Sequence, residues 1–331
     1  MQSSEESRKI ISTAGLLLVD AMVFQEVIAS SHKDVPTLSR LMESSNPKKD
    51  MEESWRYIIH KIDYEPVLDI AVRILSNIPV SPLVNQQLKQ LTSLAYDIAS
   101  SRVLLRHDLF GRIYHTLLLG KLVKYYATYY TSIPAARVLA RLLITLPSKL
   151  AVEDVPPLYS GEPLRVVDFA CGSGTLLSAI YKEVDAKYRI EGKDLRIDDL
   201  HKYLVEEGIW GFDVLHHAVH LAATVLSLHN PVPVKGSKLF ALPLGQGKHL
   251  GSVDFLTTNK LAPAFTGESI TGGGEKISIG GEEKEEITLP DFHLCILGPV
   301  GGQQLRRLQH LLTNGTQSGD SSPKARDYLL A

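Results

Sequence analysis

The chain has 331 residues, 44% of them hydrophobic, which is enough for a substantial core and for two domains. Its formal net charge of −2 excludes a strong global positive field, so any DNA-binding surface must be local. The two cysteines, Cys171 and Cys295, are too few for a disulfide framework or a cysteine-built zinc site, and they fit a reducing cytoplasm.

Residues 1–100 are predicted to form an all-helical domain. Apolar residues recur there at three- and four-residue spacing, and polar breaks separate the helices at 30–32, 44–47 and 81–82. The apolar run 15–24 contains Asp20 and is too short to span a bilayer, so it predicts a soluble helix without a signal peptide or membrane anchor. We expect a scaffold or protein-contact role for this part.

The next segment, residues 102–149, is locally basic. Such a surface can hold a phosphate backbone, and interleaved aromatic side chains can stack on bases. Tyrosines at helical spacing are also typical of a core, so DNA contact and core packing both stay open. The segment has one acid, Asp108. Its eight cations are Arg102, Arg106, Arg112, Lys121, Lys124, Arg137, Arg141 and Lys149, and its five tyrosines are Tyr114, Tyr125, Tyr126, Tyr129 and Tyr130.

A short apolar run at 164–169 is typical of a buried parallel strand, and Asp168 lies where this strand would end. Gly172 and Gly174 follow, and glycine permits positive φ and close approach of the backbone to a ligand. A helix predicted from Thr175 would direct its free N–H groups at the same point, which suits a carboxylate or phosphate. An acid beside an anion-binding turn indicates a ligand with both charges; the alternative is a purely structural turn.

Residues 168–177 resemble the Asp-Pro-x-Cys-Gly-Ser-Gly-x-Phe/Leu motif of adenine-N6 DNA methyltransferases that use S-adenosylmethionine (SAM) as cofactor, with Phe169 in place of the proline. In that family the glycine turn lies under the methionine portion of SAM, and the acid binds its ammonium group. The resemblance therefore implies a cofactor-binding set of Asp168, Ala170, Gly172, Ser173, Gly174 and Thr175.

Two flanking segments extend this resemblance. Residues 129–134 are similar to the family's Phe-Tyr-Thr-Pro run, which helps line the cofactor pocket; Tyr130 and Thr131 match it. Downstream, a predicted strand at 208–213 ends in Asp213, and in the family the corresponding acid accepts hydrogen bonds from the ribose hydroxyls of SAM. The alternative role of Asp213 is an N-cap for a helix over 214–228.

Three histidines in that predicted helix, His216, His217 and His220, do not predict a metal site, because no further ligand lies at matching spacing. A third strand is expected at 238–244, and Asp254 is a weak candidate for contact with the adenine edge of SAM. The glycine- and acid-rich residues 266–286 predict a surface loop, and 291–297 predict a fourth buried strand.

The catalytic motif of the family is where the resemblance fails. There the fourth strand ends in Asn/Asp-Pro-Pro-Tyr/Phe, whose polar groups accept the adenine amino hydrogens while the ring stacks on the flipped base. This chain has Gly298, Pro299, Val300 and Gly301, of which only Pro299 matches. We therefore expect a chain that is catalytically incomplete by itself, through a truncated or shifted reading frame near residue 297.

The sequence thus predicts an α/β protein. It divides into a helical domain (1–100), a partial SAM-binding Rossmann-like methyltransferase core (101–297) with strand order 3-2-1-4, and a divergent polar tail (298–331). By resemblance it is a cytoplasmic, adenine-specific DNA methyltransferase of a restriction-modification system, with SAM as cofactor and DNA as partner. The alternative is a non-catalytic SAM- or DNA-binding subunit that needs a specificity or complementing methylase subunit.

Overall fold

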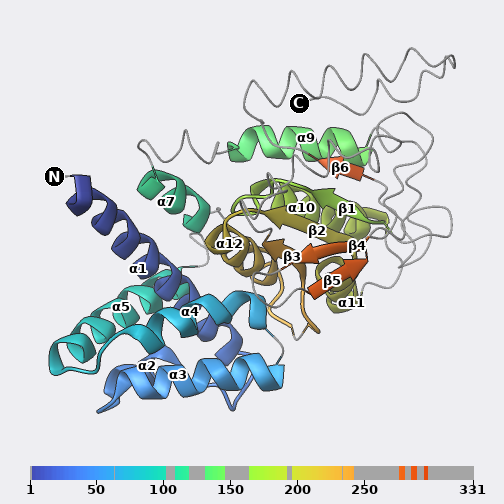
Figure 1. The fold of residues 1–331 in the computed structure, drawn as a ribbon. Coiled ribbons are helices and arrows are strands. Elements are labelled where there is room, and N and C mark those ends of the chain that lie inside the picture. The colour runs from blue at the N-terminus through green and yellow to red at the C-terminus, as the bar shows by residue number, and fades with distance from the viewer. Residues whose placement is uncertain are drawn as a thin grey trace, which may run out of the picture.

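The computed structural model combines a helical N-terminal region with a parallel β-sheet that carries helices against one face (Figure 1). This mixed α/β architecture agrees with the fold class expected from the sequence. The residues that the structure describes are 2–62, 64–101, 109–118, 131–145, 164–191, 196–232, 234–241, 276–279, 285–288 and 294–296.

The first hundred residues are helical, as predicted. Two helix starts have clear chemical causes: Thr37 accepts a hydrogen bond from the Arg40 N–H, and Ser81 accepts one from the Val84 N–H just before Pro82. The predicted polar breaks all separate helices. These helices are α1 (Gln2–Ala29), α2 (Leu38–Glu43), α3 (Pro47–Tyr57), α4 (Glu65–Asn77) and α5 (Pro82–Ser100), with a π-helical turn η1 (Ile58–Ile62) between α3 and α4.

Helix α1 is longer than its apolar run suggested. Within it, Ser7–Ala29 is long and apolar enough to cross a membrane by length and composition, and it is a longer stretch than the run 15–24 on which the sequence argument rested. Asp20, which lies inside that run, is fully buried and does not interrupt the helix. Residues 16–25 are all buried inside the protein, which is also what a core helix shows.

The sheet has four strands in the order β3-β2-β1-β6, and all neighbouring pairs are parallel. Val167 of the central strand β1 lies between Trp210 of β2 and Cys295 of β6. The predicted order 3-2-1-4 is confirmed, with β6 as the fourth strand. The strands are β1 (Val166–Asp168), β2 (Ile209–Asp213), β3 (Lys238–Ala241) and β6 (Leu294–Ile296).

Helices α10 (Thr175–Glu191) and α12 (His216–Ser227) pack against each other and against β2, and α9 (Ile133–Thr145) packs on α10. A methyl group at Gly211 of β2 would lie 2.9 Å from Leu177 Cδ1, which shows how closely α10 covers the sheet. Between α10 and β2 the chain forms α11 (Ile197–Tyr203) and a π-helical turn η2 (Leu204–Gly208).

Helix α12 also joins the sheet region to the N-terminal helices, because it contacts both α1 and α4. At this junction Asp20 Oδ2 accepts a hydrogen bond from Thr224 Oγ1 at 2.6 Å and lies 3.1 Å from His220 Nε2. All three side chains are buried. Burial raises the pKa of Asp20, while the bonds to His220 and Thr224 oppose that rise.

The predicted surface loop at 266–286 was wrong for part of its length. Residues Lys276–Ile279 (β4) and Glu285–Thr288 (β5) form an antiparallel hairpin in which Ile277 lies opposite Ile287. Alternating β-branched residues favour strands, and the surrounding glycines and acids concealed this short pattern in the sequence.

Candidate functional site

The chain turns sharply between the end of β1 and the start of α10. The turn contains two glycines, which are needed for different structural reasons. Both have positive φ, 53° at Gly172 and 82° at Gly174. A methyl group at Gly174 would lie 2.9 Å from Ala222 Cβ, so this glycine allows the turn to pack directly on α12. At Gly172 an added methyl meets none of the described residues within 4 Å, so this side of the turn is open in the described part of the chain.

Two backbone hydrogen bonds hold the turn in place. The Cys171 N–H donates to the Phe212 carbonyl at 2.9 Å, which joins the turn to β2, and the Gly174 N–H donates to the Cys171 carbonyl at 2.8 Å. The ring of Phe169, at the position where the resembling motif has proline, stacks on Phe212 at 5.5 Å. The turn is therefore anchored to β2 by both its backbone and a side chain.

Asp168 ends β1 and is 1% exposed. Its Oδ1 accepts a hydrogen bond from the Ala170 N–H at 2.9 Å, whereas its Oδ2 is buried and has no hydrogen-bond partner in the part of the chain that the structure describes. Burial raises the pKa of Asp168 to about 7; the nearby charge of Asp213 adds to the rise and the Ala170 bond opposes it. A buried acceptor that lacks a partner is costly, and a cationic ligand group would satisfy it and favour the ionised form.

Asp213 ends β2 and binds the glycine turn. Its Oδ2 accepts from the Gly172 N–H and its Oδ1 from the Leu215 N–H, both at 2.9 Å. Burial raises the pKa of Asp213, and its backbone hydrogen bonds act in the opposite direction. Each carboxylate oxygen still has acceptor capacity for a ligand hydroxyl. The alternative N-cap role was wrong in detail: α12 begins at His216, its N-cap is Leu215, and Asp213 bonds the N–H of that cap residue.

The remaining predicted cofactor-binding residues lie in different places. Ala170 is half-buried in the turn, and Ser173 and Thr175 are buried at the start of α10. Thr131 is half-buried two residues before α9. Several predicted positions lie outside the described residues, namely Tyr130, Asp254, Gly298, Pro299, Val300 and Gly301.

Two residues beside Asp213 were not assigned to the site from the sequence. Tyr114, from α7 (Leu109–Leu118), makes an edge-on contact with the ring of His217 at 5.2 Å. The Tyr114 pKa is raised by burial and by the charge of Asp213, and burial lowers the pKa of His217 to about 4, so both side chains are neutral at pH 7. Tyr114 is 3% exposed, which favours core packing over base stacking.

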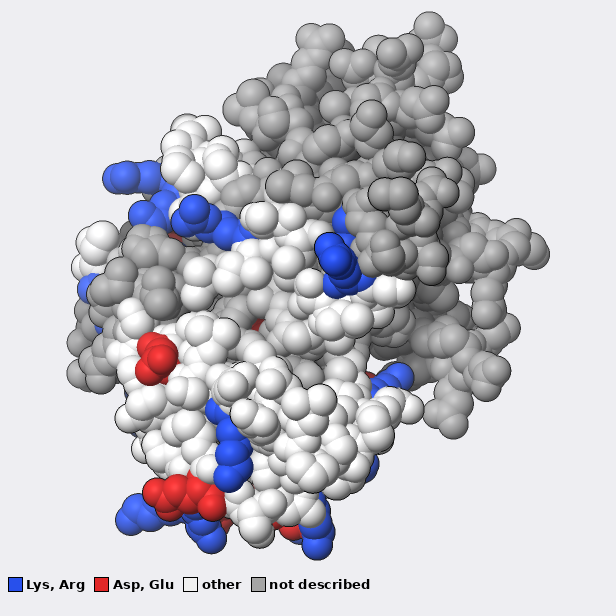
Figure 2. Space-filling model, turned by 90° about the vertical axis from the view of Figure 1, so that its left-hand side faces the viewer, with Lys and Arg blue, Asp and Glu red and all other residues white. Residues whose placement is uncertain are grey.

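The described part of the basic segment presents its arginines to solvent. Arg112 on α7 and Arg137 and Arg141 on α9 are all exposed. Among the described residues, Figure 2 shows Lys and Arg of one face in separate groups, with uncharged surface and some acidic residues between them. The surface there is locally positive at several points, without a continuous basic stripe across the described part of that face.

No family model matches this chain, and no curated protein matches it. Among solved structures, the chain is similar to the ATP-dependent Type ISP restriction-modification enzyme LlaBIII bound to DNA, with 12% sequence identity and a TM-score of 0.34. The similarity covers 71% of this chain and 18% of that one, so the chain spans less than a fifth of that enzyme. A TM-score of this size does not establish a common fold.

Proposed function

We propose that this chain binds SAM at the carboxyl ends of β1 and β2, as the cofactor-binding part of an adenine-N6 DNA methyltransferase of restriction-modification type. The observation that carries the proposal is the buried, unpartnered Oδ2 of Asp168 beside a glycine turn whose Gly172 side is open. Parallel sheets bind ligands at this edge, and the resemblance of residues 168–177 to the family motif supports SAM as that ligand.

The charges of the site suit the methionine end of SAM, which carries an ammonium and a carboxylate. Asp168 would accept hydrogen bonds from the ammonium group, and the N–H groups at the start of α10 would face the carboxylate. Asp213 would accept hydrogen bonds from the ribose hydroxyls with the acceptor capacity that Gly172 and Leu215 leave. SAM, when bound, supplies an electrophilic methyl group on its sulfonium.

Calorimetry with SAM tests this proposal. We expect weak binding by the parent chain, and at least tenfold weaker binding by Asp168→Ala and by Asp213→Ala, because each removes a charge-assisted hydrogen bond worth about 1.5–3 kcal/mol. Asp69→Ala is the matched control, since Asp69 pairs with Arg73 on the surface of α4. No heat at millimolar SAM, from a sample that circular dichroism shows to be folded, would reject the proposal.

A DNA partner is the second element of the proposal. It is supported by the exposed Arg112, Arg137 and Arg141 and by the family resemblance. Binding of duplex DNA should not depend on its sequence, and it should weaken steeply as salt rises, because cations that neutralise phosphates release counterions. Arg112→Glu should weaken binding in fluorescence anisotropy and reduce the salt slope. An unchanged affinity would mean that Arg112 is only a solvated side chain.

The second candidate function is a cytoplasmic, non-catalytic subunit that acts with a specificity or complementing methylase subunit. The degenerate motif at Gly298, Pro299, Val300 and Gly301 favours it, because neither a side-chain acceptor for the adenine amino group nor a stacking ring is present there. This proposal assigns no catalytic residue. Transfer of labelled methyl from SAM to DNA by this chain alone would contradict it.

A further inference from the structure

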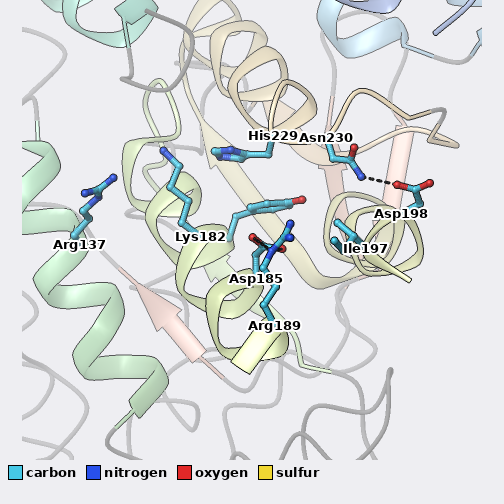
Figure 3. Close-up of a pocket in the computed structure, with 9 residues that line it drawn as sticks. Arg137, Lys182, Asp185, Arg189, Ile197, Asp198, His229 and Asn230 are labelled. Carbon is cyan, nitrogen blue, oxygen red and sulfur yellow. Dashed lines mark hydrogen bonds and ion pairs between the residues drawn. The ribbon is translucent and has the colours of Figure 1, made fainter. Parts of the chain in front are cut away.

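A pocket of about 720 Å³ opens between α9, α10, α11 and the turn that follows α12 (Figure 3). It begins six residues along α10 from Thr175, which is about 9 Å at the rise of an α-helix. It also lies beyond the carboxyl end of α12, whereas Asp213 lies before its amino end. The pocket is therefore separate from the proposed SAM site. It is lined by Arg137, Tyr181, Lys182, Asp185, Arg189, Ile197, Asp198, His229 and Asn230.

The formal charge of the lining is positive, with three cations against two acids. Both acids already have protein partners. Arg189 Nε donates to Asp185 Oδ1 at 3.0 Å and to its Oδ2 at 2.9 Å, and Asn230 Nδ2 donates to Asp198 Oδ1 at 2.9 Å. The ion pair with Arg189 offsets the charge of Asp185 on α10, whereas the neutral amide of Asn230 satisfies Asp198 on α11 without offsetting its charge.

The two other cations lie on the opposite side. Arg137 extends from α9 and Lys182 from α10, and Figure 3 shows both side chains pointing toward the gap between these helices. An arginine fork matches the oxygens of a phosphate group, and a lysine ammonium adds a compact charge that can approach from another direction. An anionic group in this gap would face two cations from two different helices.

The wall between the two sides is fixed and uncharged. The rings of Tyr181 and His229 stack at 4.4 Å with 14° between their planes. Ser178 Oγ lies 2.9 Å from His229 Nε2, and Tyr181 Oη lies 2.8 Å from His201 Nδ1. Burial lowers the pKa of His229 to about 3, and the positive charge of Lys182 contributes to this shift. The field of Lys182 therefore acts inside the pocket.

We propose that this pocket binds a phosphate group between Arg137 and Lys182, belonging either to a free phosphate ester or to a nucleic-acid backbone. The volume is within the range of small-ligand sites, so there is room for more than the phosphate itself. The site goes beyond the proposed SAM site and does not depend on it.

Pyrophosphate is the probe for the first test, by calorimetry at low salt and by the NMR signals of the His229 ring. Pyrophosphate should bind the parent chain and shift these signals. Arg137→Gln and Lys182→Gln should each weaken binding at least tenfold. Lys33→Gln, which removes the same charge from an exposed position between α1 and α2, should leave binding unchanged. All variants should bind SAM with the parent's affinity, so failure of this proposal can be distinguished from failure of the SAM proposal.

A fluorescent oligonucleotide then distinguishes the two sources of phosphate. The ligand is a nucleic-acid backbone if pyrophosphate displaces the oligonucleotide and if Arg137→Gln and Lys182→Gln weaken oligonucleotide binding. Lys33→Gln should then leave oligonucleotide binding unchanged. If pyrophosphate binds at Arg137 and Lys182 without displacing it, the ligand is a free phosphate ester. The proposal is overturned if the folded chain gives neither heat nor a His229 shift with pyrophosphate, or if Lys33→Gln weakens binding as much as the pocket variants do.

Discussion

Asp168→Asn is expected to make the SAM-free chain more stable at pH 8 and, at the same time, to weaken SAM binding by at least tenfold. The carboxylate is buried, and one of its oxygens has no hydrogen-bond partner. An asparagine amide has the same shape and keeps its carbonyl oxygen for the Ala170 N–H, but it carries no charge. The substitution therefore removes both the cost of the buried charge and the charge that would hold an ammonium group.

The sign of the pH dependence follows from the raised pKa. The unfolded chain releases the Asp168 proton near 3.8 and the folded chain near 7, so between these values the folded state binds more protons. The contribution of Asp168 to stability, read as the difference between the parent chain and Asp168→Asn, should fall as the pH rises through this window and level off above about pH 7. The difference between the two pKa values corresponds to a cost of about 4 kcal/mol for the buried charge at pH 8. The unpaired donor of the asparagine amide costs about 1–3 kcal/mol, so the free energy of unfolding should rise by about 1–3 kcal/mol.

Urea unfolding at pH 4 and pH 8 measures this effect. The parent and Asp168→Asn should differ clearly at pH 8, with no stabilisation by the substitution at pH 4. Asp213→Asn is the matched control: both oxygens of Asp213 accept backbone N–H bonds, so its amide group would face a donor and the variant should be less stable at either pH. Destabilisation of the chain by Asp168→Asn at pH 8 would contradict the claim that burying the Asp168 carboxylate is costly.

Gly174→Ala is expected to destabilise the chain by about 2–5 kcal/mol. The positive φ costs a residue with a side chain about 1–2 kcal/mol, and overpacking against α12 costs about 1–3 kcal/mol more. The new methyl would lie 2.9 Å from Ala222 Cβ and 3.0 Å from Ala222 Cα, and the backbone atom cannot move without shifting the helix. The measurement is the urea midpoint at an unchanged slope.

Gly172→Ala provides the matched control two residues earlier. It has the same conformational cost of about 1–2 kcal/mol, but its methyl has no atom of the residues that the structure describes within 4 Å. We expect a small loss of stability and a larger loss of SAM affinity, because the methyl occupies the open side of the turn. Equal destabilisation by the two substitutions would show that the turn does not pack on α12 as described.

The local elements of this protein could be predicted from its sequence. The helix break at 81–82, the apolar strand before Asp168 and the glycine turn all depend on neighbouring residues, so periodicity and residue chemistry were sufficient. The strand order also followed, because the motif resemblance brought a known order with it and β6 takes the fourth place. The hairpin β4-β5 was missed, because its four-residue strands are too short for a clear period.

Only the tertiary structure decided how the acids of the site are buried and hydrogen-bonded, and whether α9, α10 and α11 enclose a pocket. The sequence places an acid at the end of β1, but whether one of its oxygens lacks a partner depends on what β2 and the turn bring beside it. Asp20 and Thr224 bond across 204 positions of the chain, and Arg137 and Lys182 line one pocket only because α9 packs on α10. Desolvation and pairing depend on distances in space, which residue spacing along the chain does not contain.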